Sequence, residues 1–314
     1  MTAAGAGRAC PRGGGGAATG RGWDAAEAYA WCDRFARTTY ENFTKVSWFL
    51  SPVRRRHILA VYAFCRRTDD IGDAAAGDRL ALLDEWEAAL DRALSGERGD
   101  AGLTALAETT RACAIDPRWY RKLIEANRMD QRQQRWPAYA DLLRYCDHSA
   151  NPVGRMVLAV FGYRDEERGA RSDAVCTGLQ LANFWQDVRR DRELGRVYLP
   201  LEDRERFGCR EADLDAGSAG ERLRALLAFE VGRAEECFRR GRELLPVLDS
   251  ESRFEVELFI KGGEHVLRAI RKQRFDVLSR RPEVSRAAKL RMVAGTAVRL
   301  GSARSGLWPG RRHR

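Results

Sequence analysis

The chain has 314 residues, of which 44% are hydrophobic, and a formal net charge of +10. This is enough apolar material for a large buried core, in one large domain or two smaller ones. The 55 basic residues are interleaved with 45 acidic ones. That pattern suits an anionic substrate or weak attraction to an anionic membrane surface, and it argues against a nucleic-acid-binding protein.

The N-terminal segment and the cysteines both favour a cytoplasmic protein. Residues 1–22 are rich in glycine and alanine and contain no hydrophobic run of the kind found in signal peptides, so we expect them to be disordered. The eight cysteines include no C-x-x-C pair. A zinc site or a disulfide framework is therefore not indicated, and reduced thiols are expected.

From Trp23 onward, apolar residues recur with the spacing of amphipathic helices. Ser51 and Pro52 provide an N-cap followed by proline at the first helical position. A break is expected at Asn151-Pro152, because the residue before proline is pushed out of the α region. The predicted helices cover residues 24–39, 52 to the first acidic motif, 78–95, 101–113, 117–129, 137–149, 152–161, 168–193, 220–246, 252–279 and 284–300, with a long polar connection at 202–219.

The sequence shows no alternating strand pattern, no internal repeat and no run of 18 or more apolar residues that could span a membrane. We therefore predict an all-α fold. A single helical domain is expected over residues 23–300, followed by a basic tail at 301–314.

Two acidic motifs stand out on these helices. The first places Asp69 and Asp73 four residues apart, and the second places Asn183, Asp187 and Asp191 at the same spacing. A step of four residues returns to nearly the same face of a helix, so each motif projects its oxygens from one stripe. Two such stripes facing each other would bind Mg²⁺, which takes a few carboxylates together with water and phosphate oxygens.

An ordinary solvated helix face is the alternative explanation for one such motif, but the phase of the apolar residues argues against it. Ile58, Tyr62 and Cys65 mark a buried stripe, and its next positions are Asp69 and Asp73. Buried carboxylates need cations or hydrogen-bond donors. The second motif is similar, because its polar face is flanked by apolar residues: Gln180, Asn183, Asp187 and Asp191 beside Leu179, Phe184 and Val188.

Several segments together resemble the squalene/phytoene synthase family over residues 25–300. They are Cys65–Asp73, Tyr145-Cys146, Val153-Gly154, Gln180–Asp191 and Gly195–Pro200. Within the family, three segments look most like the hydroxysqualene synthase branch of bacterial hopanoid pathways: Glu41–Phe43, Ser149–Gly154 and Asn183–Asp187. Gln186 stands where the phytoene and presqualene-diphosphate branches usually have arginine.

The resemblance implies an isoprenoid synthase fold around a large central cavity. It implies that Mg²⁺ bridges to a prenyl diphosphate through five side chains, Asp69, Asp73, Asn183, Asp187 and Asp191, of which the four aspartates are also expected to be catalytic residues. The implied substrate contacts are Arg66, Gln180, Arg196, Tyr198, Phe43 and Phe184. Tyr145 matches the tyrosine near the reacting carbons, where a phenol can hold water, pass a proton or stabilise a cation.

Each of these roles has a plainer alternative. Arg66 could form an ion pair with Asp69, and Tyr145 could be an ordinary core tyrosine.

The family often has tyrosine where Gly263 stands. Two glycines in mid-helix, Gly262 and Gly263, cost about 1 kcal/mol each relative to alanine, so either close helix packing or cavity space is required there. The Arg280-Arg281 pair is interpreted as structural or peripheral.

The expected reaction is conversion of presqualene diphosphate to hydroxysqualene. Mg²⁺ and arginine would neutralise the departing diphosphate, aromatic rings would stabilise the cation, and water would capture it. No NADPH is expected, because the branch-like motifs indicate an alcohol product and no dinucleotide-binding turn is present. Condensation of two prenyl diphosphates to presqualene diphosphate, squalene or phytoene stays open.

Two non-enzymatic alternatives also stay open. One is a basic helical protein of the membrane surface or of nucleic acids, and the other is an inactive scaffold. The interleaved charge argues against a nucleic-acid partner. A cytoplasmic location is expected. The resemblance is compatible with peripheral contact at the inner face of the cell membrane, and with association with other squalene-pathway enzymes.

Overall fold

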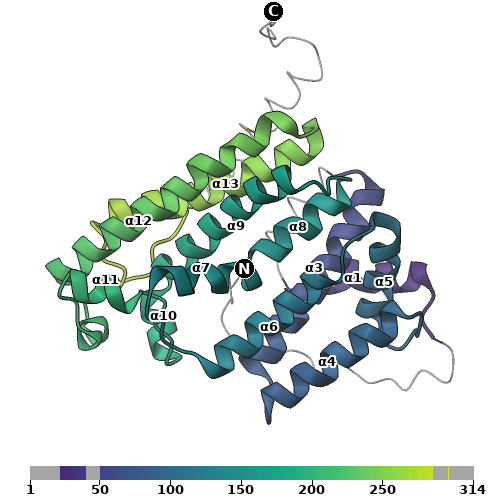
Figure 1. Cartoon of the computed structure of the whole chain (residues 1–314), viewed down its shortest axis with the longest axis horizontal. Helices are drawn as coiled ribbons and strands as arrows, with labels where there is room; N and C mark the ends of the chain where they lie inside the picture. The colour runs from purple at the N-terminus through teal and green to yellow at the C-terminus, as the bar shows by residue number, and fades with distance from the viewer. Residues whose placement is uncertain (1–21, 40–49, 286–295, 297–314) are drawn as a thin grey trace, which may run out of the picture. The chain divides into compact units, whose positions relative to one another are not determined.

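The computed structural model describes residues 22–39, 50–285 and 296, and their regular structure is helical (Figure 1). These ranges contain no β-strand, only an isolated bridge between Arg135 and Val197. The all-α prediction is confirmed. The helices are α1 (Ala25–Thr39), α3 (Pro52–Ala74), α4 (Arg79–Leu94), α5 (Ala101–Cys113), α6 (Arg118–Arg132), α7 (Tyr139–Ser149), α8 (Asn151–Val160), α9 (Glu166–Gln186), α10 (Val188–Glu193), α11 (Leu201–Arg206), α12 (Glu221–Gly241) and α13 (Ser250–Lys272), with 3-10 helices η1 (Glu211–Asp215) and η2 (Arg242–Val247).

Helix starts follow the capping chemistry of the sequence. Ser51 caps α3, where its side chain accepts a hydrogen bond from the Arg54 backbone N–H. Aspartate side chains cap four more helices in the same way, at Asp78, Asp100, Asp165 and Asp249. Each cap satisfies backbone N–H groups that have no partner within the helix.

Three predicted boundaries were wrong. The helix expected over 168–193 is interrupted at Asp187, which has φ −106° and ψ 16°. The polar connection expected at 202–219 contains α11 and η1. The helix expected to reach residue 279 ends at Lys272, because Arg274 and Phe275 adopt positive φ angles of 52° and 59° that an α-helix cannot include.

Some predictions fall outside the described residues. These are the disorder expected at 1–22, of which only residue 22 is described, the expected substrate contact at Phe43, nearly all of the helix expected at 284–300 and the basic tail expected at 301–314. Among the helices that are described, none has both the length and the apolar character needed to cross a bilayer.

The helices divide into two compact units after Gln131. In the first unit, α1, α3 and α5 pack against one another through small side chains, with Ala28, Cys32, Ala60, Ala63 and Ala105 buried together. Small residues allow helix axes to approach closely. The prediction of one domain over residues 23–300 stays a prediction.

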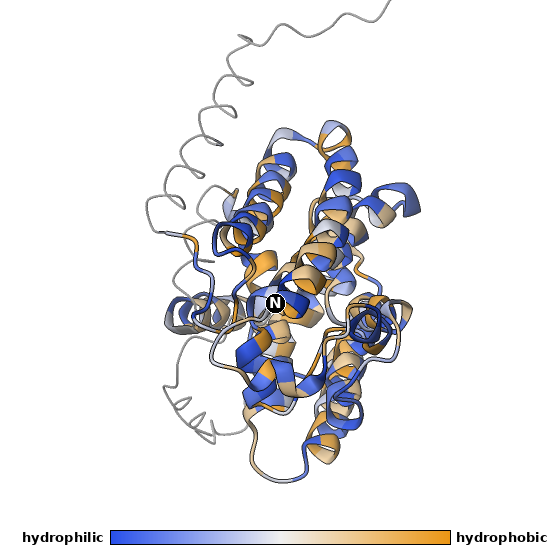
Figure 2. Cartoon of the chain, turned by 90° about the vertical axis from the view of Figure 1, so that its left-hand side faces the viewer, coloured by the Kyte–Doolittle hydropathy of each residue, from blue (hydrophilic) through white to orange (hydrophobic). Residues whose placement is uncertain are grey.

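In the second unit, α9 packs against α7, α8, α12 and α13 (Figure 1). Most helices carry hydrophobic and hydrophilic residues on different sides (Figure 2). Phe238 of α12 is 1% exposed and lies against two glycines, Gly178 of α9 and Gly263 of α13. The helix with the most neighbours in its unit, α9, therefore carries the start of the second acidic motif, at Asn183.

Candidate active site

The first acidic motif lies in the last two turns of α3. Asp69 is only partly exposed, and burial raises the pKa of its carboxyl to about 6, with the neighbouring Asp73 acting in the same direction and a hydrogen bond from Asn127 opposing it. Asp73 is exposed, because α3 ends one residue later at Ala74. The inward position predicted for both carboxylates therefore holds for Asp69 and was wrong for Asp73.

Arg66 lies one turn before Asp69 and forms an ion pair with Asp70 at 2.6 Å. The alternative partner considered from the sequence, Asp69, is not the ion-pair partner. Asp70 thus supports Arg66 from a position between the two aspartates of the motif. The guanidinium of Arg66 is held by one carboxylate at the helix end that carries Asp69 and Asp73.

Two residues of α6 support this end of α3, and the sequence analysis did not identify them. The side chain of Asn127 packs so closely on Gly72 that a Cβ there would lie 2.1 Å from its Oδ1. Gln131 donates to the Gly72 carbonyl at 2.9 Å. The sequence does indicate a buried position for Asn127, because this residue continues the apolar stripe of Tyr120 and Leu123 at helical spacing.

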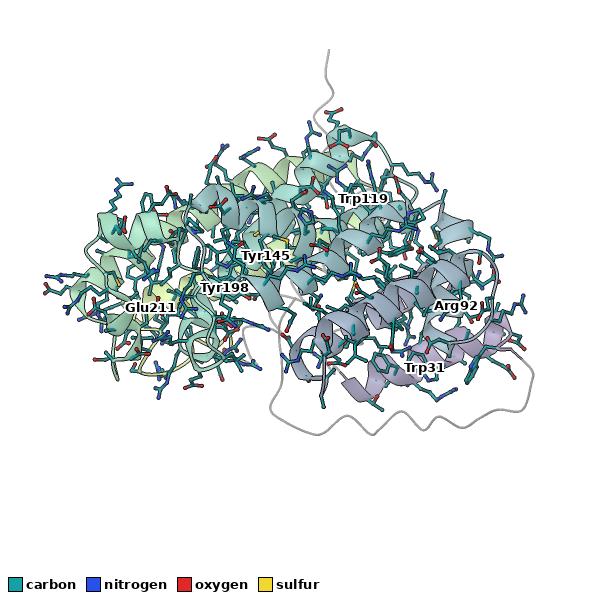
Figure 3. The ribbon with its side chains drawn as sticks, turned by 60° about the horizontal axis from the view of Figure 1, so that its bottom comes forward. Trp31, Arg92, Trp119, Tyr145, Tyr198 and Glu211 are labelled. Atoms are coloured by element: carbon teal, nitrogen blue, oxygen red, sulfur yellow. The ribbon has the colours of Figure 1, made fainter. Side chains whose placement is uncertain are left out.

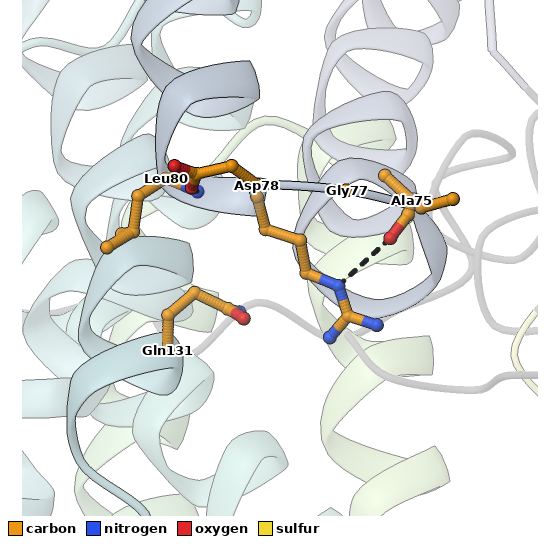
Figure 4. A pocket seen from close by; sticks show the side chains of 7 residues that line it. Ala75, Gly77, Asp78, Leu80 and Gln131 are labelled. Atoms are coloured by element: carbon orange, nitrogen blue, oxygen red, sulfur yellow. Dashed lines mark hydrogen bonds between the residues drawn. The ribbon is translucent and has the colours of Figure 1, made fainter.

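Beyond α3, an open hollow of about 520 Å³ is lined by residues 75–80 and Gln131 (Figure 4). Arg79, one of the lining residues, donates to the Ala75 carbonyl at 3.1 Å. Its walls are mainly a loop and its flanking helix ends, and it contains none of the residues predicted to bind substrate.

The second motif spans the interruption between α9 and α10. Asp187 is 6% exposed, and Asn183 and Asp191 are partly exposed. The Asp187 N–H donates to the Asn183 carbonyl at 2.9 Å, and the Asp191 N–H donates to the Asp187 carbonyl at 2.8 Å. The four-residue register thus continues through the interruption. Gln180, 3% exposed, lies one turn earlier on α9.

The buried Asp187 carboxylate binds Arg281, a residue interpreted from the sequence as structural or peripheral. Arg281 Nε lies 2.5 Å from Asp187 Oδ1, and its Nη2 lies 3.0 Å from Oδ2. The same Nη2 donates to Gln186 Oε1 at 3.1 Å, and the Gln186 amide donates to the Pro282 carbonyl at 2.5 Å. Arg281 is therefore part of the site. Its local sequence gives no hint of this, because its partners lie more than 90 residues away.

Aromatic rings gather beside the second motif. Phe184 and Tyr198 stack at 3.9 Å between centroids, and Tyr145 lies 6.1 Å from Phe184 and 5.8 Å from Tyr198. Tyr145 and Tyr198 are labelled in Figure 3. Trp136, which the sequence analysis missed, lies 4.9 Å from Tyr145 and is 2% exposed. The structure thus brings together three residues that the sequence predicted for the site and adds a fourth ring.

A small hollow of about 10 Å³ adjoins this aromatic cluster, and that is about the space one water molecule needs. Asp191, Arg196 and Tyr198 line it together with Phe184. The backbone N–H of Arg196 donates to the Asp191 carbonyl at 2.8 Å, which ties the loop after α10 to the motif.

Arg135, which was not identified from the sequence, holds the loop after α10 in place. It donates to the Gly195 carbonyl at 2.5 Å and pairs with Glu211 at 2.6 Å. Glu211 also pairs with Arg192 of α10 at 2.7 Å. The hydrogen bond from Arg135 lowers the pKa of Glu211, so this carboxylate stays ionised between its cations.

The donor types fit the predicted Mg²⁺. Carboxylate and amide oxygens are ligands that this hard cation accepts, and the buried Asp187 carboxylate already faces a cationic group in Arg281. Within the ranges that the structure describes, no three His, Cys, Asp or Glu side chains converge as a metal site. Metal binding by Asp69, Asp73, Asn183, Asp187 and Asp191, and shared use of both motifs, stay predictions.

The sequence profile of squalene/phytoene synthases matches residues 36–288. The chain belongs to this family. The 15-cis-phytoene synthase of Synechocystis is 32% identical over 278 residues, an alignment that covers 84% of this chain and 82% of the relative. As a squalene/phytoene synthase family member, this protein is an enzyme that acts on prenyl diphosphates, and both non-enzymatic alternatives are set aside.

Solved structures agree with this assignment. The squalene synthase HpnC from Alicyclobacillus acidocaldarius is 44% identical, with a TM-score of 0.76 over 79% of this chain and 94% of that one. A dehydrosqualene synthase crystallised with a ligand has a TM-score of 0.81 at 24% identity over 88% and 98% of the two chains. The isoprenoid synthase fold predicted from the motifs is confirmed.

Proposed function

We propose that this family member is a hydroxysqualene synthase that acts on presqualene diphosphate. The observation that carries the proposal is Gln186, a buried neutral amide at the position where the condensing branches usually have arginine. The 44% identity to a squalene synthase, against 32% to a phytoene synthase, supports a product of the squalene type.

In the proposed reaction, the carbon–oxygen bond breaks and the diphosphate leaves with the electron pair. Mg²⁺ supplies charge neutralisation for the diphosphate when it is bound. The residues proposed to bind Mg²⁺, as several ions, are Asp69, Asp73, Asn183, Asp187 and Asp191. Arg66 is proposed to hold phosphate oxygens, and its guanidinium suits them because it presents several donors in one plane.

The cyclopropylcarbinyl cation that remains would rearrange against the aromatic cluster. Trp136, Tyr145, Phe184 and Tyr198 offer ring faces that stabilise a cation without attacking it. A water oxygen then forms the new carbon–oxygen bond, and its proton leaves to solvent or to a nearby base. The hollow beside Asp191, Arg196 and Tyr198 has room for one such water.

The second candidate is head-to-head condensation of two prenyl diphosphates to presqualene diphosphate, squalene or phytoene. The 32% identity to phytoene synthases favours it. Contact with a membrane surface and with other squalene-pathway enzymes remains predicted for either candidate.

Product analysis separates the two candidates. Purified enzyme with Mg²⁺ receives presqualene diphosphate in one reaction and farnesyl diphosphate in another, each with and without NADPH. We expect hydroxysqualene from presqualene diphosphate in equal yield with and without NADPH. Squalene that forms only with NADPH, or condensation products from farnesyl diphosphate alone, would overturn the proposal.

A further inference from the structure

The segment after α13 is anchored so that Arg281 reaches the second motif. Asp276 accepts hydrogen bonds from the backbone N–H groups of Ala219 and Ser279 at 2.9 Å and 3.1 Å. Arg189 donates to the Leu278 carbonyl at 2.8 Å. These bonds fix the segment just before Arg281, so the guanidinium can leave Asp187 by side-chain rotation while the backbone stays in place.

Asp187 and Arg281 depend on each other electrostatically. The carboxylate is 6% exposed, and a buried carboxylate without a cation is costly. Both of its oxygens accept a bond from Arg281. A metal ion on the same carboxylate would face the guanidinium at short range, where two positive charges repel strongly.

Gln186 makes this arrangement possible. Its amide oxygen accepts from Arg281, and its amide nitrogen donates to the Pro282 carbonyl. A neutral side chain can do both at once, whereas an arginine at this position would repel Arg281. Gln186 therefore holds Arg281 in place without competing for Asp187.

We propose that Arg281, held by Gln186, is a positioning residue that pairs with Asp187 and gives way when Mg²⁺ binds to this carboxylate. The inference rests on the metal role of Asp187 in the proposed function. Because binding couplings are reciprocal, a cation that opposes Mg²⁺ at Asp187 must itself be released by Mg²⁺. Arg281 and Gln186 would thereby lower the affinity of Asp187 for Mg²⁺.

The test measures Mn²⁺, a paramagnetic substitute for Mg²⁺, by the loss of its free EPR signal during titration of the full chain without substrate. We expect Arg281→Gln to bind Mn²⁺ about fivefold more tightly than the unmodified chain, and Gln186→Leu to change in the same direction by less. Arg280→Gln is the matched control, because it removes the neighbouring charge from the same segment, and it should bind Mn²⁺ as the unmodified chain does.

Unchanged or weaker Mn²⁺ binding by Arg281→Gln overturns the inference, since a purely structural role would loosen the site. If Arg281→Gln does not fold, Gln186→Leu decides by the same criterion. Asp187→Asn separates the two levels of the argument. If Asp187→Asn binds Mn²⁺ more weakly while Arg281→Gln shows no gain, the metal role of Asp187 stands and only the role assigned to Arg281 is refuted. If Asp187→Asn binds Mn²⁺ with unchanged affinity, the metal role of Asp187 is itself refuted.

Discussion

Phe238 occupies the space that a side chain at Gly263 would need. A Cβ on Gly263 would lie 2.2 Å from Phe238 Cζ, and the same ring lies 3.1 Å from the corresponding point on Gly178. The ring is held between α9 and α13 and has little freedom to move away. Of the two explanations that the sequence left open for the paired glycines, close helix packing is the one that applies at Gly263.

We therefore expect Gly263→Ala to lower the free energy of unfolding by about 1–3 kcal/mol, because the added methyl group overpacks the contact with Phe238. Gly262→Ala is the control on the same helix, since nothing lies within 4 Å of a Cβ there. It should gain up to about 1 kcal/mol from better helix propensity. Urea denaturation followed by circular dichroism measures both, and shifts of the same sign would contradict this view of the packing.

Glu230 predicts a pH dependence of stability. Its side chain is 0% exposed beside Asp203 and Arg233, and burial raises its pKa from 4.5 to about 8. Between these values the unfolded chain has lost a proton that the folded chain keeps. Stability from this group is therefore fully present below pH 4.5 and falls by up to about 1.4 kcal/mol per pH unit as pH rises towards 8.

Glu230→Gln should remove that decline. The free energy of unfolding of Glu230→Gln relative to the unmodified chain should therefore rise steadily from about pH 5.5 to about pH 7.5, a range that lies between the two pKa values. The control is Glu236→Gln, an exposed position on the same helix that pairs with Arg239. Denaturation at several pH values gives the comparison, and parallel profiles for Glu230→Gln and the unmodified chain would refute the raised pKa.

Much of the fold was predictable because its signals are local. Helix periodicity and the caps at Ser51 and Asp100 depend on neighbouring residues, and so does the four-residue spacing of the acidic motifs. The interruption at Asp187 was not predictable in this way. Its carboxylate is bound by Arg281, which lies 94 residues along the chain.

The site was predictable where residue type and spacing carry the chemistry. The aromatic residues Tyr145, Phe184 and Tyr198 were each identified and do lie together. Trp136 joins them from a connecting segment between helices, where no periodic pattern marks a buried ring. Contacts between distant segments are set by packing, which a single sequence does not display.

Both acidic motifs should be required for turnover. We expect Asp69→Asn and Asp187→Asn each to reduce kcat/KM by roughly 100-fold or more while helix content is retained, because each removes a charged group that balances cations at the diphosphate. Asp84→Asn, an exposed partner of Arg128, is the control and should behave as the unmodified enzyme. Near-full activity of either motif variant at limiting Mg²⁺ would exclude that motif from the reaction.

Glu211 should affect the reaction through the loop that carries Arg196 and Tyr198. Glu211→Gln weakens the contacts of Arg135 and Arg192, so the loop loses its fixed position. We expect kcat to fall by about tenfold, less than the roughly hundredfold loss that a misplacement of about 1 Å near reacting groups can cause. Asp215→Asn, which also pairs with Arg192, should have a smaller effect. An unchanged kcat in Glu211→Gln would contradict this role, and equal losses in both variants would assign the effect to Arg192 rather than to Arg135.

The most direct test of the proposed function is the fate of water oxygen. Presqualene diphosphate is incubated with the enzyme and Mg²⁺ in ¹⁸O-labelled water, with and without NADPH, and the lipid product is analysed by mass spectrometry. Capture of the cation by water predicts hydroxysqualene that carries one ¹⁸O atom in both reactions. Squalene without label, formed only when NADPH is present, would contradict the account.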